Sequence, residues 1–214
     1  MTPSVTSDAA NEIEAKSPCP TRIPPDYSKD QGHRYGNFKN YYAFHPPSNR
    51  IKTLDAILDY IVEYRAPKNN MKVAKRPKHA TTDSNRIDDR FLYCDVGCNE
   101  GDLTMEVAER IRGRLSSQAA IEIFGIDLDD VLIKRANSKF QNSETGSRVK
   151  FLQADMCCCE ELENTVPDNL HLLSLFSTSM WLHIHAGDNG FRLILERLAK
   201  KTRFFLIEPQ PSKW

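Results

Sequence analysis

The chain has 214 residues, with 29 Lys and Arg balanced by 29 Asp and Glu, and an isoelectric point near 7.0. This balance excludes a strongly basic nucleic-acid-binding tail. The hydrophobic fraction of 40% and the mean hydropathy of -0.54 are typical of a soluble globular protein. No apolar run is long enough for a membrane helix, and the N-terminus lacks the features of a secretory signal. We therefore expect a cytoplasmic protein, with the nucleus as the alternative location.

The six cysteines follow no metal-binding pattern. They are Cys19, Cys94, Cys98 and three consecutive residues at 157–159, so no CxxC pair exists and adjacent thiols do not easily converge on one ion. We expect reduced thiols and no bound metal.

The N-terminal part divides into three segments. Residues 1–30 are rich in proline and are predicted to be a disordered tail. Residues 31–64 combine an aromatic stretch from Tyr35 to Phe44 with a helix whose apolar face has helical spacing. The aromatic stretch either closes over a ligand as a lid, or stacks on a terminal base, or covers the sheet as a hydrophobic flap. The predicted apolar face of the helix contains Ile51, Leu54, Leu58 and Ile61.

Residues 65–90 form a basic segment with eight Lys and Arg against three Asp. It is predicted to be a flexible, solvated insertion, and the alternative is a loop that attracts phosphates beside an RNA-binding face.

Apolar segments and amphipathic helices alternate from residue 91 to the end of the chain. This alternation predicts a mostly parallel sheet covered by helices on both faces, the Rossmann-like α/β architecture. The expected strands are 91–97, 121–127, 149–155, 170–177 and 202–209.

Polar residues stand at the predicted carboxyl ends of three strands, where ligands bind in open α/β sheets. The first turn, DVGCNEG, contains Asp95, Gly97 and Asn99, and its acidic residues would repel a pyrophosphate. The second strand ends in Asp127, a candidate for the two hydroxyls of a ribose, and the third in Asp155, a candidate for an adenine amine. Together they predict a pocket for S-adenosyl-L-methionine, although each aspartate alone is equally explained as a helix cap. A nicotinamide-dependent oxidoreductase is disfavoured by the acidic turn.

Several blocks resemble one known family. The segments YGNFKNYY, NRIKTL, DVGCNEG, GIDLDDVLIKRA, MWLHIHAGDNG and FLIEPQPSKW are similar to the bicoid-interacting-type RNA 5′-phosphate methyltransferases, most of all to the branch that acts on 5′-monophosphates. The resemblance implies transfer of a methyl group from S-adenosyl-L-methionine to the 5′-monophosphate of a small RNA of the transfer-RNA or precursor-microRNA class. It also implies that Gly97 shapes the turn and that the cofactor site is lined by Arg50, Asn99, Asp127, Asp155, Met156 and Phe176.

A terminal phosphate is largely ionised at neutral pH because its second pKa is about 6, so no general base is needed. The residues that position it should be hydrogen-bond donors. The candidates are Tyr35, Lys39, Tyr42, Arg50, His183 and His185, and each histidine is also open to a purely structural explanation.

The end of the chain departs from the expected pattern, because no antiparallel hairpin follows the last strand and an apolar sheet edge would be exposed. We expect a C-terminally truncated or alternatively spliced methyltransferase core, or an edge covered by another segment. The alternative function is a catalytically inactive RNA-binding module that retains the fold. A monomer is expected.

Overall fold

The computed structural model describes residues 39–65, 90–141 and 148–209 of the chain. Its centre is a five-stranded sheet in the order β3-β2-β1-β4-β5, and all neighbouring strands pair in parallel. The predicted disordered tail, nearly all of the basic segment and Tyr35 lie outside the described residues. The strands are β1 (Arg90–Val96), β2 (Ala120–Asp127), β3 (Arg148–Gln153), β4 (Leu170–Phe176) and β5 (Thr202–Glu208).

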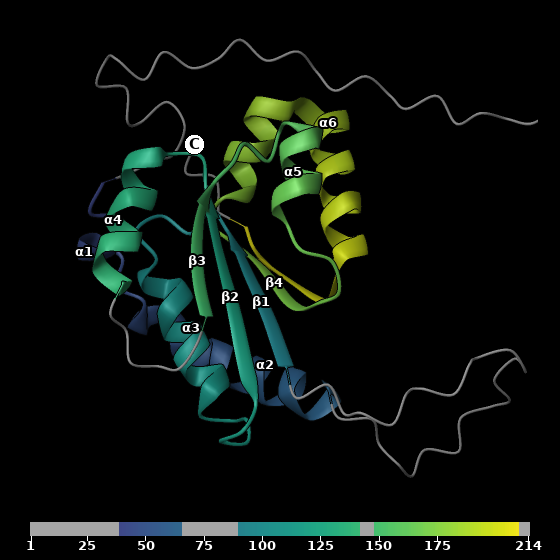
Figure 1. The fold of residues 1–214 in the computed structure, drawn as a ribbon. Coiled ribbons are helices and arrows are strands. Elements are labelled where there is room, and N and C mark those ends of the chain that lie inside the picture. Colours follow the sequence, from purple (N-terminus) through teal and green to yellow (C-terminus); the bar gives the residue numbers. More distant parts are fainter. Residues whose placement is uncertain (1–38, 66–89, 142–147, 210–214) are drawn as a thin grey trace, which may run out of the picture.

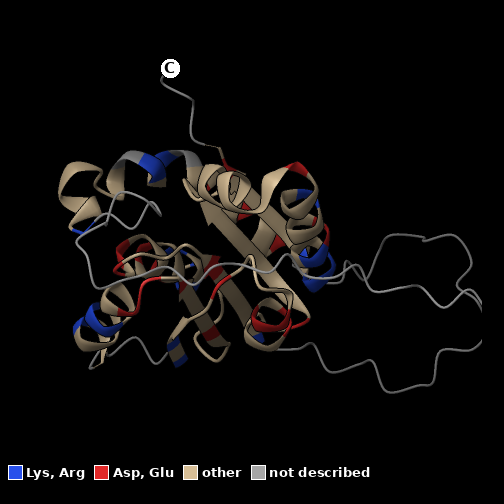
Figure 2. Ribbon diagram, turned by 90° about the horizontal axis from the view of Figure 1, so that it is seen from above, with Lys and Arg blue, Asp and Glu red and all other residues tan. Residues whose placement is uncertain are grey.

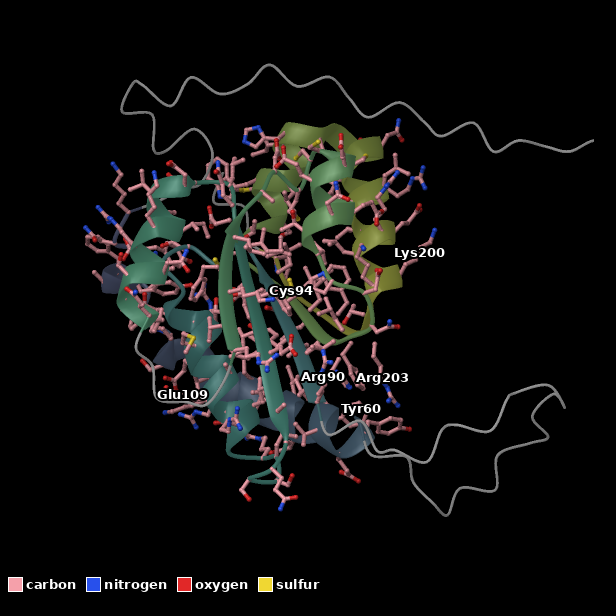
Figure 3. All side chains as sticks on the ribbon, viewed as in Figure 1. Tyr60, Arg90, Cys94, Glu109, Lys200 and Arg203 are labelled. Carbon is pink, nitrogen blue, oxygen red and sulfur yellow. The ribbon has the colours of Figure 1, made fainter. Side chains whose placement is uncertain are left out.

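The central strands form because their apolar residues are buried on both faces of the sheet. In β1, for example, Tyr93 packs in one hydrophobic cluster and its neighbour Cys94 in another. Figure 3 shows Cys94 within the interior of the molecule. Side chains alternate along a strand, so continuous apolar sequence is what a two-sided core requires.

Helices cover both faces of the sheet, with α2, α3 and α4 on one side and α5 and α6 on the other (Figure 1). The four predicted apolar residues of α2 are all buried against β1, β2 and β4. The Rossmann-like α/β fold predicted from the sequence is therefore confirmed. The helices are α1 (Tyr41–Phe44), α2 (Ser48–Arg65), α3 (Asp102–Arg112), α4 (Asp130–Phe140), α5 (Cys159–Thr165) and α6 (Ser179–Lys201).

Three local features differ from the expectation. The short helix α5 was not predicted, because its seven residues bury only Leu162 and carry no repeating apolar face. Strand β3 ends at Gln153, so Asp155 follows the strand rather than ending it. The long helix α6 is interrupted at Gly187, whose φ of 67° and ψ of 177° are not helical.

Strand β5 is an edge strand within the described part of the chain, where it pairs with β4 alone. None of the described helices has the length and apolar character needed to cross a bilayer. Lysine and arginine residues are spread over several helices rather than gathered on one element (Figure 2).

Candidate functional site

An open cavity of about 870 Å³, mouth included, lies at the carboxyl ends of β1, β2 and β4. Parallel strands converge there because the chain turns from each strand into the next helix at the same edge of the sheet. One side of the cavity is built by β2 and the residues after β3, and the other by α1, α2, β4 and the first turns of α6. The lining residues are Tyr41, Tyr42, Arg50, Val96, Gly97, Asn99, Ile126, Asp127, Leu128, Ala154, Asp155, Met156, Cys157, Phe176, Ser177, Thr178, Trp181, Leu182 and His185.

Asp127, the last residue of β2, is held by backbone donors from two neighbouring loops. The N–H of Asn99 donates to Oδ2 at 2.8 Å, and the N–H of Asp129 donates to Oδ1 at 3.0 Å. Burial raises the pKa of Asp127 to about 6, although these hydrogen bonds favour the ionised form. The carboxylate is therefore fixed in position and mainly ionised at neutral pH.

The turn after β1 approaches the start of α6 closely. Gly97 has a φ of 81°, and a Cβ added there would lie 2.0 Å from Thr178 Oγ1. Its N–H donates to Ile126 O at 2.7 Å, which ties the turn to β2. Both the positive φ and the close approach require glycine, so Gly97 shapes the cavity wall.

Asp95, which was expected to contact the cofactor, is not among the residues that line the cavity. Its side chain is buried and accepts hydrogen bonds of 2.6 Å from Thr104 and Ser174. Burial raises its pKa to about 6, and the two hydroxyls oppose the shift. Asp95 thus joins β1 to α3 and β4 beneath the turn.

The other two acidic residues of the turn form ion pairs with a neighbouring helix. Glu100 forms an ion pair with Arg135 at 2.7 Å, and Asp102 pairs with Lys139. Both partners belong to α4, so these carboxylates join the turn to a helix and are absent from the cavity wall.

Asp155 and Met156 line the cavity from the loop after β3. Asp155 Oδ1 accepts the N–H of Cys157 at 2.9 Å, and the Ala154 N–H donates to Asp127 O at 3.0 Å. These bonds hold the loop beside the end of β2, although β3 itself has already ended. Asp155 therefore lies at the cavity, but on the loop after β3 rather than at the end of the strand.

Arg50, near the start of α2, lines the opposite side of the cavity within a hydrogen-bond network. Its Nε donates to Glu208 Oε1 at 2.9 Å, and its Nη2 donates to Tyr41 Oη at 2.9 Å and to Ser177 Oγ at 2.8 Å. Burial opposes the charge, but the bonds to Tyr41 and Glu208 outweigh it and raise the pKa of Arg50.

Two residues of the aromatic stretch reach the cavity. Tyr41 and Tyr42 both line it, and Tyr42 also packs against the core cluster around α2. Burial raises the pKa of Tyr42 well above 10, so its hydroxyl remains protonated at neutral pH. Phe44, by contrast, is 80% exposed.

Two of the candidate phosphate ligands lie away from the cavity. Lys39 is exposed and does not line it. His183 is bound to Asp188 at 2.6 Å and stacks on Phe191, so it bridges the kink of α6 instead. His185 does line the cavity, because it lies two residues further along the helix and therefore on a different face.

The sequence analysis did not single out several lining residues. Ser177, Thr178 and Trp181 lie where β4 passes into α6, and Glu208 approaches from the end of β5. The strand pattern could have identified these residues, because the carboxyl ends of all strands in a parallel sheet lie at the same edge.

The lining residues fit S-adenosyl-L-methionine. A carboxylate has about four acceptor sites, so Asp127 can receive ribose hydroxyls while it holds its backbone donors. Apolar side chains such as Ile126, Leu128 and Met156 offer a surface for a purine, and Arg50 offers a cation for the carboxylate of the methionine part. The cofactor, when bound, supplies an activated methyl group on a sulfonium.

This fold, with a nucleoside site at the carboxyl ends of its strands, defines a Rossmann-like cofactor-binding protein. The family model described as "Methyltransferase domain" matches residues 87–210, which is more than half of the chain. The chain therefore belongs to the methyltransferase domain family, and the prediction of S-adenosyl-L-methionine as cofactor is confirmed.

Curated relatives carry more specific names. A protein of Danio rerio named "Pre-miRNA 5'-monophosphate methyltransferase" is 29% identical over 193 residues, which cover 84% of this chain and 67% of that protein. The human protein named "RNA 5'-monophosphate methyltransferase" is 27% identical over 190 residues, which cover 84% of this chain and 59% of that protein.

Among solved structures, the PH0226 protein from Pyrococcus horikoshii resembles the chain with a TM-score of 0.46 and 15% identity. The match covers 79% of this chain and 65% of that one.

Proposed function

We propose that this chain transfers a methyl group from S-adenosyl-L-methionine to the 5′-terminal monophosphate of a small RNA, of the precursor-microRNA or transfer-RNA class. The named relatives support this substrate, and so does the resemblance of the segments that line the cavity. We further propose that the protein acts in the cytoplasm as a monomer.

The observation that carries the proposal is the division of polar groups across the cavity. The carboxylates of Asp127 and Asp155 lie on the side of β2 and β3, whereas Arg50, Tyr41 and His185 lie on the side of β4 and β5. Carboxylates suit the hydroxyls and amine of a nucleoside, and donors suit a phosphate. A phosphate therefore enters from the side of α1 and α6.

Tyr41 has the hydrogen-bond geometry that a phosphate-positioning group needs. Its oxygen accepts from Arg50 Nη2, which leaves the hydroxyl hydrogen to donate to another acceptor. His185 of α6, on the same side of the cavity, provides a second ring that can donate. Both groups hold an oxygen of the phosphate without taking a proton from it.

Catalysis is then mainly a matter of position. The phosphate oxygen is already ionised at neutral pH, and the reaction is an in-line displacement at the methyl carbon. Holding the two reactants in line can supply several kcal/mol of the barrier reduction. The chain's own residues fix the nucleoside at one side and the phosphate at the other.

The test is methyl transfer from labelled S-adenosyl-L-methionine to three RNAs of one sequence that end in a 5′-monophosphate, a 5′-triphosphate or a 5′-hydroxyl. We expect efficient labelling of the monophosphate RNA and none of the hydroxyl RNA. Equal labelling of all three would refute the proposal. Cofactor binding without any transfer would favour an inactive RNA-binding module.

A further inference from the structure

Glu208 at the end of β5 contacts both Arg50 and Ser177. Its Oε1 accepts from Arg50 Nε at 2.9 Å, and its Oε2 accepts from Ser177 Oγ at 2.9 Å. Its backbone oxygen also accepts from the Ser177 N–H at 3.1 Å. Glu208, Ser177 and Arg50 therefore close a ring of hydrogen bonds that joins β5, β4 and α2.

This ring fixes the orientation of the Arg50 side chain, which has several rotatable bonds. Arginine presents five N–H donors in a rigid fork. In the described part of the chain, Nε and Nη2 of Arg50 hold Glu208, Ser177 and Tyr41. The two N–H groups of Nη1 make none of these bonds, so they are the ones that a ligand in the cavity can use.

Resting on the proposed function, we propose that Glu208 is a positioning residue, which acts through Arg50 so that the Nη1 edge of the guanidinium receives an oxyanion in the cavity. Two oxyanions meet at this site: the carboxylate of the cofactor and the terminal phosphate of the RNA. Both are bound by the same planar charge-assisted contact. The contact is strong only when the guanidinium is held in place before the ligand arrives.

The test compares Glu208→Ala, Glu208→Gln and Arg50→Lys. Glutamine keeps an oxygen for Arg50 Nε, and its amide can donate to Ser177 Oγ, so it preserves the ring without the charge. Glu122→Gln is the matched control, since Glu122 pairs with Arg90 at 3.1 Å at the starting ends of the strands, where Figure 3 shows Arg90.

Two nucleoside probes distinguish the source of the oxyanion. S-adenosylhomocysteine contains the carboxylate, whereas 5′-methylthioadenosine fills the nucleoside site without it. If Arg50 holds the carboxylate, Glu208→Ala weakens S-adenosylhomocysteine binding about tenfold and leaves methylthioadenosine binding within about twofold. If it holds the phosphate, both nucleosides bind normally, and the KM for RNA rises about tenfold with little change in kcat.

Two further results check that Glu208 acts through Arg50. Glu208→Gln should retain most of the affected affinity, and Arg50→Lys combined with Glu208→Ala should lose no more than Arg50→Lys alone. Three results would overturn the proposal. Glu208→Ala could weaken the binding of both nucleosides equally, or leave both nucleoside affinities and the KM for RNA unchanged. The losses in the double variant could also be additive. The nucleoside measurements need no RNA, so failure of the wild type to methylate RNA is a separate result.

Discussion

The backbone N–H of Asn99 donates to the Asp127 carboxylate at 2.8 Å, across 28 residues of sequence. Asn99 has a φ of 53°, in the left-handed region that asparagine tolerates better than most residues. The bond couples the turn after β1 to the end of β2, so the position of the carboxylate depends on both strands.

Replacing Asp127 by alanine should weaken binding of S-adenosylhomocysteine by more than about tenfold, because a fixed acceptor of two hydrogen bonds is lost. Calorimetry measures the change. Asp130→Ala is the matched control, because Asp130 is an exposed neighbour paired with Lys134. An unchanged dissociation constant in Asp127→Ala would remove the ribose assignment.

The affinity of the wild-type protein for S-adenosylhomocysteine should fall as the pH is lowered. Burial raises the pKa of Asp127 to about 6, so the carboxylate loses its charge and one acceptor site as the pH drops through that value. Affinity measured from about pH 7.5 to about pH 5 should decline in the wild type and change much less in Asp127→Asn. Parallel curves for the two proteins would show that another group controls the pH dependence.

Asp95 should make stability depend on pH in the opposite direction to an ion-paired carboxylate. Its pKa is raised from 3.8 to about 6 in the folded state, so the folded protein binds a proton more readily than the unfolded chain. Its contribution to the free energy of unfolding is therefore largest below the unfolded pKa and is lost as the pH rises through about 6.

Urea unfolding of the wild type and Asp95→Asn measures this contribution. As the pH falls from about 7 to about 4.5, the wild type should gain stability relative to the variant, which has no proton to bind at this position. A stability difference that stays constant over this range would contradict the assignment.

Gly97→Ala should lower both the melting temperature and cofactor affinity, since the added Cβ meets Thr178 Oγ1 at 2.0 Å and the φ is positive. Gly113→Ala is the matched control, because its φ of -61° is helical and the nearest atom lies 3.7 Å from the added Cβ. We expect the control to match or slightly exceed the wild type in thermal unfolding. Equal behaviour of the two variants would show that the turn has more room than its geometry indicates.

His185 and His183 provide a second matched pair. His185→Ala should lower kcat/KM for monophosphate RNA by about tenfold, because one donor to the phosphate is lost. His183→Ala should stay within about threefold of the wild type, because its ring binds Asp188 outside the cavity. Equal losses in the two variants would remove His185 from the phosphate site.

The sequence predicted the sheet well because parallel strands require continuous apolar segments, and these are visible without knowledge of the partners. It also placed Asp127 at the end of a strand, because the apolar pattern of β2 alone locates that residue. For Asp95 the strand pattern locates the residue at the right edge of the sheet, but it does not show that Thr104 and Ser174 donate hydrogen bonds to its carboxylate.

The hydrogen-bond network around Arg50 could not be predicted from the sequence, for a different reason. Arg50 and Glu208 are separated by 158 residues, and only the complete sheet brings the end of β5 to the start of α2. His183 lies away from the cavity for a local reason. The backbone is not helical at Gly187, and Asp188 forms a hydrogen bond with His183 across this interruption.

Locating the transferred methyl group tests the central claim most directly. A monophosphorylated RNA, methylated with the wild-type protein and digested to nucleotides, would be analysed by mass spectrometry. We predict one modified nucleotide, the 5′-terminal one, with the added methyl on its phosphate. A methyl group on a base or a ribose would contradict the account.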